Sequence, residues 1–73
     1  MDKLTFTLNK NAVGDAAESL REMFREKMQS KFPDSEIIVN IQAVEQEGVI
    51  ILHDNEVLYT VEEFCLDFDV ELN

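Results

Sequence analysis

The residues best suited to chemistry in this chain are the carboxylates of its C-terminal half. Eleven Asp and Glu residues follow Lys31, and no further Lys or Arg accompanies them. The first 31 residues hold all six bases and five acids, so the net charge of −10 belongs almost wholly to the rest. Carboxylates on a rigid surface can pair with Lys and Arg side chains that bind phosphates in other complexes. The charge pattern therefore favours binding to a basic partner.

The spacing of these carboxylates suggests that they imitate the phosphates along a nucleic-acid strand. Residues 66–72 alternate between apolar and acidic types. As a strand, this stretch would present Asp67, Asp69 and Glu71 on one face, about 6.6 Å apart. The predicted contact residues are Glu45, Glu47, Asp54, Glu56, Glu62, Glu63, Asp67, Asp69 and Glu71. The alternative is an ordinary solvated acidic surface that keeps a small protein in solution.

Catalytic, cofactor and metal sites are not expected from the sequence. His53 lies beside Asp54, but no motif places a nucleophile for this pair to activate. The only glycines are Gly14 and Gly48, which rules out a glycine-rich phosphate loop. Leu72 stands where a calcium loop beginning at residue 67 requires glycine. One His and one Cys supply no zinc ligand set either, so we expect no enzyme and no bound cofactor.

The N-terminal half must supply much of the scaffold. Residues 4–8 alternate as a half-buried strand does, and residues 9–11 read as a loop. A helix should then begin after Asp15, which is expected to be its N-cap, with Glu18 completing a capping box. Apolar residues recur at spacings of three and four along this helix, and Pro33 marks its end.

Three further strands are predicted at residues 36–44, 49–53 and 56–59. Gly48 is available for a positive φ in the turn before the second of these strands. Asp54 and Asn55 form a two-residue hairpin loop of the kind that tolerates left-handed conformations.

The last segment carries two conflicting signals. Thr60 and Glu63 form a capping box, and Val61, Phe64, Cys65 and Phe68 fit a helical stripe. Residues 66–72 nevertheless alternate with the strand period. We expect a short helical turn at residues 61–65 followed by a terminal strand, with helix and strand both open for residues 66–72.

Together these elements predict one acidic α+β domain spanning residues 1–73. One long amphipathic helix should pack on a mostly antiparallel sheet of four or five strands, in the order β-α-β-β-β-turn-β. The single cysteine allows no internal disulfide, so apolar residues, 45% of the chain, must provide the core.

The sequence favours a cytoplasmic protein. Its first residues lack the basic and apolar regions of a signal peptide, and its longest apolar run is far too short to cross a bilayer. An unpaired cysteine fits a reducing compartment. The net negative charge opposes direct binding to nucleic acid or to an anionic membrane.

Two resemblances bear on function. Residues 20–34, LREMFREKMQSKFPD, resemble the middle of the DinI family. Those small damage-inducible proteins modulate the RecA recombinase with an acidic C-terminal helix, so this resemblance implies a DinI-like modulator of a recombinase. The charge pattern as a whole is similar to that of phage-encoded DNA-mimic inhibitors, which block histone-like HU proteins, uracil-DNA glycosylases, restriction enzymes or CRISPR effectors.

The leading hypothesis is a DNA mimic, used by a bacteriophage in host takeover. It would occupy the nucleic-acid site of a basic bacterial DNA-binding protein in the host cytoplasm and inhibit its DNA binding. A histone-like HU nucleoid protein is the first choice, because charge rather than base sequence dominates its binding. The alternative is a protein–protein interaction module or antitoxin-like subunit that uses a sheet edge or the helix, with acidity serving solubility. The target and the oligomeric state stay open, a homodimer included.

Overall fold

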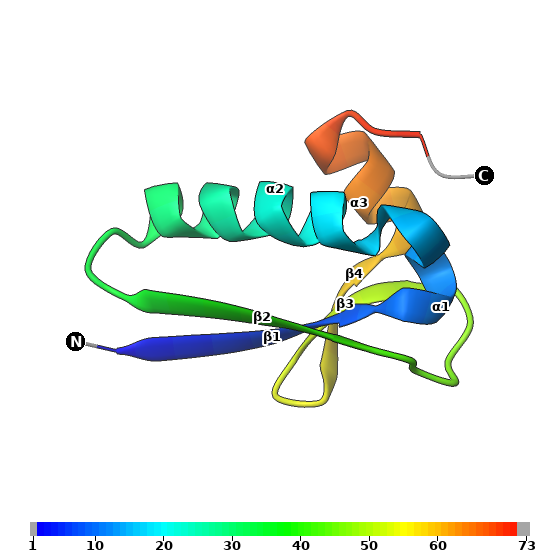
Figure 1. Ribbon diagram of the computed structural model, residues 1–73, viewed down its shortest axis with the longest axis horizontal. Helices are drawn as coiled ribbons and strands as arrows, with labels where there is room; N and C mark the ends of the chain where they lie inside the picture. The colour runs from blue at the N-terminus through cyan, green and yellow to red at the C-terminus, as the bar shows by residue number, and fades with distance from the viewer. Residues whose placement is uncertain (1, 72–73) are drawn as a thin grey trace.

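The chain forms a four-stranded sheet with its helices on one side (Figure 1). The structure is a computed structural model that describes residues 2–71. Its elements are β1 (Lys3–Asn9), α1 (Lys10–Val13), a 3-10 turn (Gly14–Ala16), α2 (Ala17–Lys31), β2 (Glu36–Gln42), β3 (Val49–His53), β4 (Glu56–Thr60) and α3 (Val61–Phe68). None of the helices within residues 2–71 has the length and apolar character that crossing a bilayer requires.

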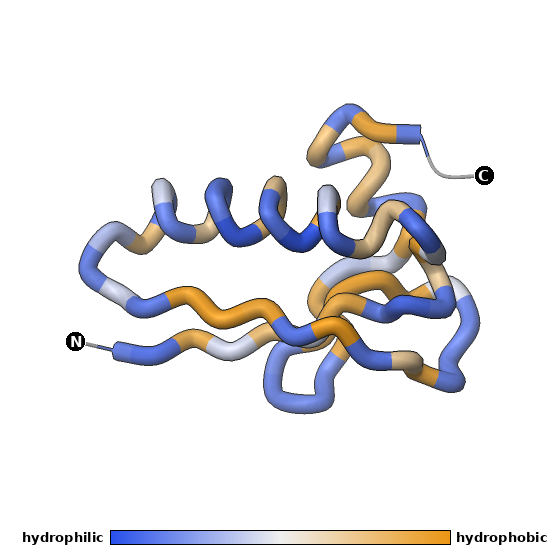
Figure 2. Tube along the Cα trace, viewed as in Figure 1, coloured by the Kyte–Doolittle hydropathy of each residue, from blue (hydrophilic) through white to orange (hydrophobic). Residues whose placement is uncertain are grey.

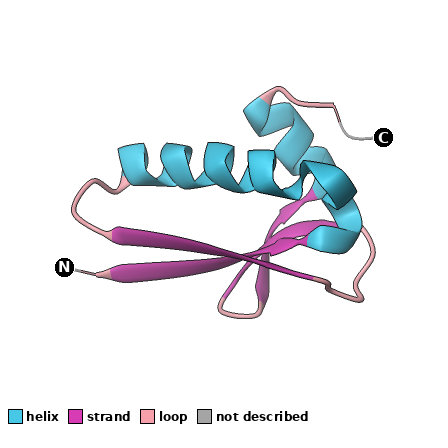
Figure 3. Cartoon of the chain, viewed as in Figure 1, coloured by secondary structure: helices cyan, strands magenta, loops and turns pink. Residues whose placement is uncertain are grey.

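The strands lie in the order β2-β1-β3-β4. β1 and β2 are parallel and are joined by the crossover through α2, whereas β1–β3 and β3–β4 are antiparallel. Figure 3 shows the resulting two layers. The predicted α+β arrangement of one long helix on a mostly antiparallel, four-stranded sheet is therefore confirmed.

The core is an aromatic cluster centred on Phe24 of α2, which is fully buried. Its ring lies 5.1 Å from that of Phe6, 5.8 Å from Phe68, 6.2 Å from Tyr59 and 6.4 Å from Phe64. One residue thus joins β1, β4 and α3 to the long helix. The apolar stripe predicted for this helix is confirmed, since its buried residues are Ala17, Leu20, Phe24 and Met28.

The start of the helical region differs from the prediction. Residues 9–11 are not a loop, because Asn9 caps α1 with its side-chain oxygen, 3.0 Å from the backbone N of Asn11. Gly14 then redirects the chain with φ 53° and ψ −126°, a conformation that favours glycine. α2 follows with Ala16 as its N-cap and no capping side chain, so the expected capping box of Asp15 and Glu18 is wrong. Asn is about as good an N-cap as Asp. The helical region therefore begins after Asn9, whose side chain also forms hydrogen bonds with the backbone of Val44 and Val49.

The two predicted turns are confirmed. Asp54 and Asn55 have φ values of 53° and 67°, the left-handed pair of a type I′ hairpin. Gly48 has φ 79° directly before β3. Figure 2 shows both connections as hydrophilic stretches beside apolar strands.

The predicted terminal strand is wrong, because the helix that begins at Val61 continues to Phe68. The capping box of Thr60 and Glu63 is present, and the rings of Phe64 and Phe68 stack at 4.2 Å. Both rings reach the cluster around Phe24 only because residues four apart share a helix face. This packing outweighs the local alternation and leaves Leu66 85% exposed.

A buried amide ties one end of the sheet together. Asn9 is only 2% exposed, and its Nδ2 donates to the carbonyl oxygen of Val49 at 2.8 Å. Its Oδ1 accepts from the backbone N–H of Val44 at 2.9 Å and from that of Asn11 at 3.0 Å. One side chain thereby links the end of β1, the loop after β2 and the start of β3.

Replacing this amide should destabilise the domain strongly. Asn9→Ala would leave the buried Val49 carbonyl and the Val44 N–H without partners, and we expect a loss of about 2–4 kcal/mol in the free energy of unfolding. Asn40→Ala, at an exposed site on β2, is the matched control. Urea unfolding followed by circular dichroism measures both. A difference of less than about 0.5 kcal/mol between the variants would show that Asn9 is not a structural junction.

Candidate functional site

The nine carboxylates predicted to meet a partner are all exposed, and they fall into three groups. They are Glu45 and Glu47 in the β2–β3 loop, Asp54 and Glu56 at the β3–β4 hairpin, and Glu62, Glu63, Asp67, Asp69 and Glu71 on or just after α3. In Figure 1 the hairpin and α3 lie on different sides of the sheet region. The nine residues therefore do not form one continuous row.

The regular spacing predicted for Asp67, Asp69 and Glu71 is also wrong. Asp67 lies in the last turn of α3, and Asp69 is its C-cap in the left-handed conformation, with φ 54° and ψ 49°. Glu71 follows outside any helix or strand. The strand face on which these groups were expected to align does not exist, so a repeat of phosphate-like spacing does not arise there.

Asp67 is engaged in the fold. The hydroxyl of Tyr59 donates to its Oδ2 at 2.7 Å, and the Nζ of Lys27 lies 3.8 Å from the same oxygen. The Lys27 ammonium also sits 4.2 Å from the centroid of the Phe68 ring. These contacts hold α3 against α2 and β4, and they offset the charge of Asp67 within the molecule.

Two more of the nine have partners nearby. The Oε1 of Glu63 accepts from the backbone N–H of Thr60 at 3.0 Å, as the capping box requires. The Oδ2 of Asp54 lies 3.4 Å from the Nε2 of His53. The other ring nitrogen of His53 is 3.1 Å from the carbonyl oxygen of Thr5, and its ring packs 4.9 Å from that of Phe6. His53 thus contacts β1 as well as the neighbouring Asp54 of its own hairpin.

The structure brings together carboxylates from two distant segments. The backbone N–H of Val61, the first residue of α3, donates to the carbonyl oxygen of Gly48 at 2.8 Å. This bond fixes the start of α3 against the β2–β3 loop. Glu47 from the loop and Glu62 from the helix consequently line the same open hollow of about 640 Å³. We call these two residues, together with Glu45 of the same loop, which lines the neighbouring hollow, the acidic end.

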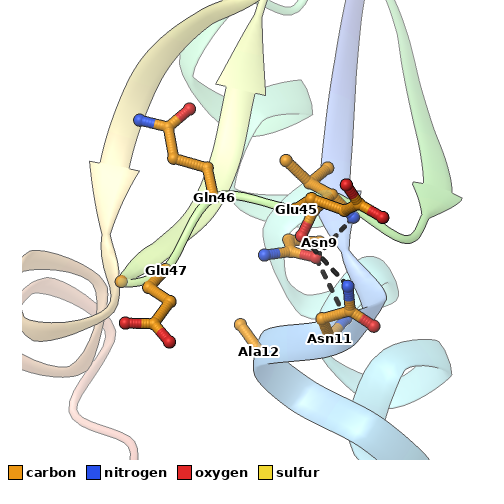
Figure 4. Close-up of a pocket in the computed structure, with 8 residues that line it drawn as sticks. Asn9, Asn11, Ala12, Glu45, Gln46 and Glu47 are labelled. Carbon is orange, nitrogen blue, oxygen red and sulfur yellow. Dashed lines mark hydrogen bonds between the residues drawn. The ribbon is translucent and has the colours of Figure 1, made fainter.

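The neighbouring hollow, of about 380 Å³, is lined by Asn9, Asn11, Ala12, Val44, Glu45, Gln46, Glu47 and Gly48 (Figure 4). The amides of Asn9 and Asn11 are occupied by the protein, since Asn11 Nδ2 donates to the Val44 carbonyl at 3.0 Å in addition to the bonds of Asn9. Figure 4 shows the carboxylates of Glu45 and Glu47 on opposite sides of Asn9. The hollow therefore supports the loop and leaves both carboxylates on the surface.

Charge compensation differs between the two halves of the molecule. On α2, Arg21 lies 2.7 Å from Glu18, and Arg25 lies 2.7 Å from Glu22. The hydrogen bond from Arg25 holds the pKa of Glu22 below its ordinary value. In contrast, no Lys or Arg within residues 2–71 lies within 4.0 Å of a carboxylate of the acidic end. Its three charges are not offset by close ion pairs.

A separate apolar groove of about 240 Å³ runs between the C-terminal part of α2 and the hairpin. It is lined by Leu4, Phe6, Met28, Lys31, Phe32, His53, Leu58 and Tyr59. Phe32 and Leu58 remain 41% and 43% exposed there. The part of the chain that the structure describes holds no group of three or more His, Cys, Asp or Glu arranged to bind a metal ion.

No protein family, curated protein or solved structure matches this chain. Any function must therefore be argued from the surfaces and charges themselves.

Sequence reasoning missed two of the contacts that matter most. Asn9 bonds to residues 35 and 40 positions away, and Lys27 and Asp67 are 40 positions apart. Tyr59 and Asp67 are 8 positions apart and meet only because α3 folds back over β4. For Asp67, the only local signal was the helical stripe at residues 61–68, which the alternation of residues 66–72 concealed.

The Tyr59–Asp67 contact makes a spectroscopic prediction. The hydrogen bond to Asp67, with burial as a smaller cause, raises the pKa of Tyr59 from 10.0 to about 12. The fold therefore favours the neutral phenol, and this contribution to stability is complete below pH 10 and is lost as the pH rises toward 12. Because the chain has one Tyr and no Trp, tyrosinate absorbance reports Tyr59 alone.

Asp67→Ala should lower the pKa of Tyr59 back toward 10, since it removes both the acceptor and the nearby charge. Glu71→Ala, which removes the same charge beyond the helix, is the control and should leave the titration near its original midpoint. Identical titrations of the wild-type chain and Asp67→Ala would contradict the contact.

Proposed function

We propose that this chain is a DNA mimic that binds the nucleic-acid site of a basic DNA-binding protein and inhibits DNA binding. The observation that carries the proposal is the uneven compensation of charge. The bases lie on β1, α1 and α2, where most of them pair with carboxylates of the chain. The carboxylates of the acidic end lie on other elements and make no such pairs.

The acidic end is also held in place, which a binding surface requires. The Val61–Gly48 hydrogen bond and the amide of Asn9 fix the segments that carry these side chains. Glu62 lies in the first turn of α3, where the helix dipole stabilises a negative charge. Because the backbone that carries these carboxylates is already ordered, less conformational entropy is lost when a partner binds.

The nine carboxylates should contribute unequally. Glu63 and Asp67 already serve the capping box and the Tyr59–Lys27 contact, so we expect them to add less to binding. The acidic end forms the centre of the proposed surface. Asp54 and Glu56 lie at the opposite end of β3 and β4, and Asp69 and Glu71 follow α3, so a partner would contact them separately from the acidic end.

The target class follows from the kind of recognition that such a surface offers. Carboxylates imitate phosphates and carry no base edges, so the partner should be one whose affinity depends mainly on phosphate contacts. A histone-like HU nucleoid protein in a bacterial cytoplasm remains the first choice for this reason. Geometry, rather than total charge, must then select it from other basic proteins.

A second candidate function gains support from α3. The last helix within residues 2–71 is α3, and it carries Glu62, Glu63 and Asp67. An acidic C-terminal helix is the feature with which the DinI family modulates RecA. Binding to a recombinase filament on single-stranded DNA, tested by co-sedimentation, would favour this function over the capture of a nucleoid protein.

A salt-resistant interaction module is the remaining alternative. Thr7 and Leu52 lie side by side on neighbouring strands. In Figure 3 the helices lie on one side of the sheet, and the opposite side is not covered. A partner bound there would be held mainly by apolar contacts, so its binding would persist at high salt.

The decisive experiment is a competition assay. A histone-like HU protein is bound to fluorescent duplex DNA, and this chain is added at increasing salt. We expect release of the DNA at about 50 mM salt and progressively weaker release as screening increases. DNA that stays bound at a large excess of the chain would contradict the proposal, and binding that persists at high salt would favour the interaction module.

Arrangement can be separated from total charge with two matched variants. Glu45→Gln, Glu47→Gln and Glu62→Gln together remove three charges from the acidic end. The control combines Glu18→Gln, Glu22→Gln and Glu26→Gln on α2, which changes the net charge equally. We expect the first variant to lose about tenfold in inhibition, and the control to lose much less, since exposed charge pairs are worth about 0.2–1 kcal/mol each and three are removed. Equal losses would show that only net charge matters.

A further inference from the structure

Resting on the proposed function, we infer that the partner contributes an apolar side chain as well as basic ones. The site is an apolar surface beside the acidic end, formed by Val57 on β4 and by Val61, Cys65 and Leu66 on α3. We call these four residues the outer α3 surface. Its occupant is a Lys- or Arg-rich segment of the partner that carries Leu or a similar apolar residue between its bases.

The outer α3 surface is accessible. Leu66 is 85% exposed and Val57 is 43% exposed. Leu66 and Cys65 line a shallow hollow of about 430 Å³ together with Val61 and Glu62. Val61 and Glu62 also line the hollow of about 640 Å³ that contains Val57. The two hollows therefore share the start of α3, and the four residues of the outer α3 surface form apolar parts of their lining.

The exposure of Leu66 does not follow from the packing of the core. Phe64 is fully buried on the opposite side of α3, and the helix is anchored by the capping box and by Asp67. A polar residue at position 66 would be compatible with the same helix and the same core. A single exposed apolar residue is common, but a group of apolar side chains with a polar rim is typical of a protein-binding surface.

The charges at the rim specify the occupant. Glu62 borders both hollows and Glu47 borders the larger one. A second copy of this chain would bring the same uncompensated carboxylates close together, which disfavours self-association there. Lys and Arg fit better, because their apolar stems can cover the valines while their charged groups reach the carboxylates. An apolar side chain between two such bases would cover Leu66.

Two synthetic peptides of equal length and charge test this inference. One alternates Lys with Leu and the other alternates Lys with Ser, and each is fluorescently labelled so that anisotropy gives its affinity. We expect the Lys/Leu peptide to bind about tenfold more tightly, since burying most of a leucine side chain accounts for a factor of that size. Equal affinities, or no measurable binding of either peptide, would overturn the inference.

Matched variants locate the preference. Leu66→Gln should remove most of the advantage of the Lys/Leu peptide, and Val57→Thr should reduce it. Leu58→Gln is the control, because Leu58 is an exposed leucine, as accessible as Val57, that lines the groove beside α2 instead. An unchanged tyrosinate titration verifies that α3 is still docked in each variant. A larger loss in Leu58→Gln than in Leu66→Gln would place the apolar contact in the other groove and overturn the inference.

The result separates this inference from the proposed function. If the chain releases DNA from an HU protein but binds both peptides equally, the mimicry stands and the apolar contact fails. If the Lys/Leu preference depends on Leu66 but no DNA is released, the docking surface stands and the mimicry fails.

Discussion

The buried amide of Asn9 holds together the end of the molecule on which its proposed function depends. Its three hydrogen bonds join β1, the loop after β2 and the start of β3, and the bond from Val61 to Gly48 adds the start of α3. Each of these backbone groups would otherwise be unpaired or would need water. The positions of the surface carboxylates at this end therefore rest on polar contacts below them.

The helix α2 and the acidic end differ in how far their charges are paired within the molecule. On α2 the arginines neutralise neighbouring glutamates, and Lys27 reaches across to Asp67 beneath the Phe68 ring. Packing within the aromatic cluster around Phe24 offsets the repulsion between the remaining carboxylates. The domain has a net charge of −10 and pairs most of its bases internally, so its unpaired carboxylates give the surface a negative charge.

Local signals predicted most of the fold. The stripe on α2, the left-handed Asp54–Asn55 turn and the Thr60 cap each depend on residues close together in sequence. The failures had long-range causes. The helical region begins earlier than predicted because Asn9 caps α1 and its amide also bonds to Val44 and Val49, whereas α2 has no side-chain cap. Residues 66–68 became helical because Phe68 packs on Phe24. The exposure of the nine carboxylates was predictable from their type, but their grouping depends on contacts between distant segments.

The most direct test of a surface centred on the acidic end is a nuclear magnetic resonance titration. The ¹⁵N-labelled chain would be mixed with an unlabelled histone-like HU protein at low salt, and the amide shifts of the free and bound forms compared. We predict the largest shifts at residues 45–48 and 61–66, with small changes along α2. Shifts concentrated on α2 or on the uncovered face of the sheet, or no shifts at all, would contradict the proposed mode of binding.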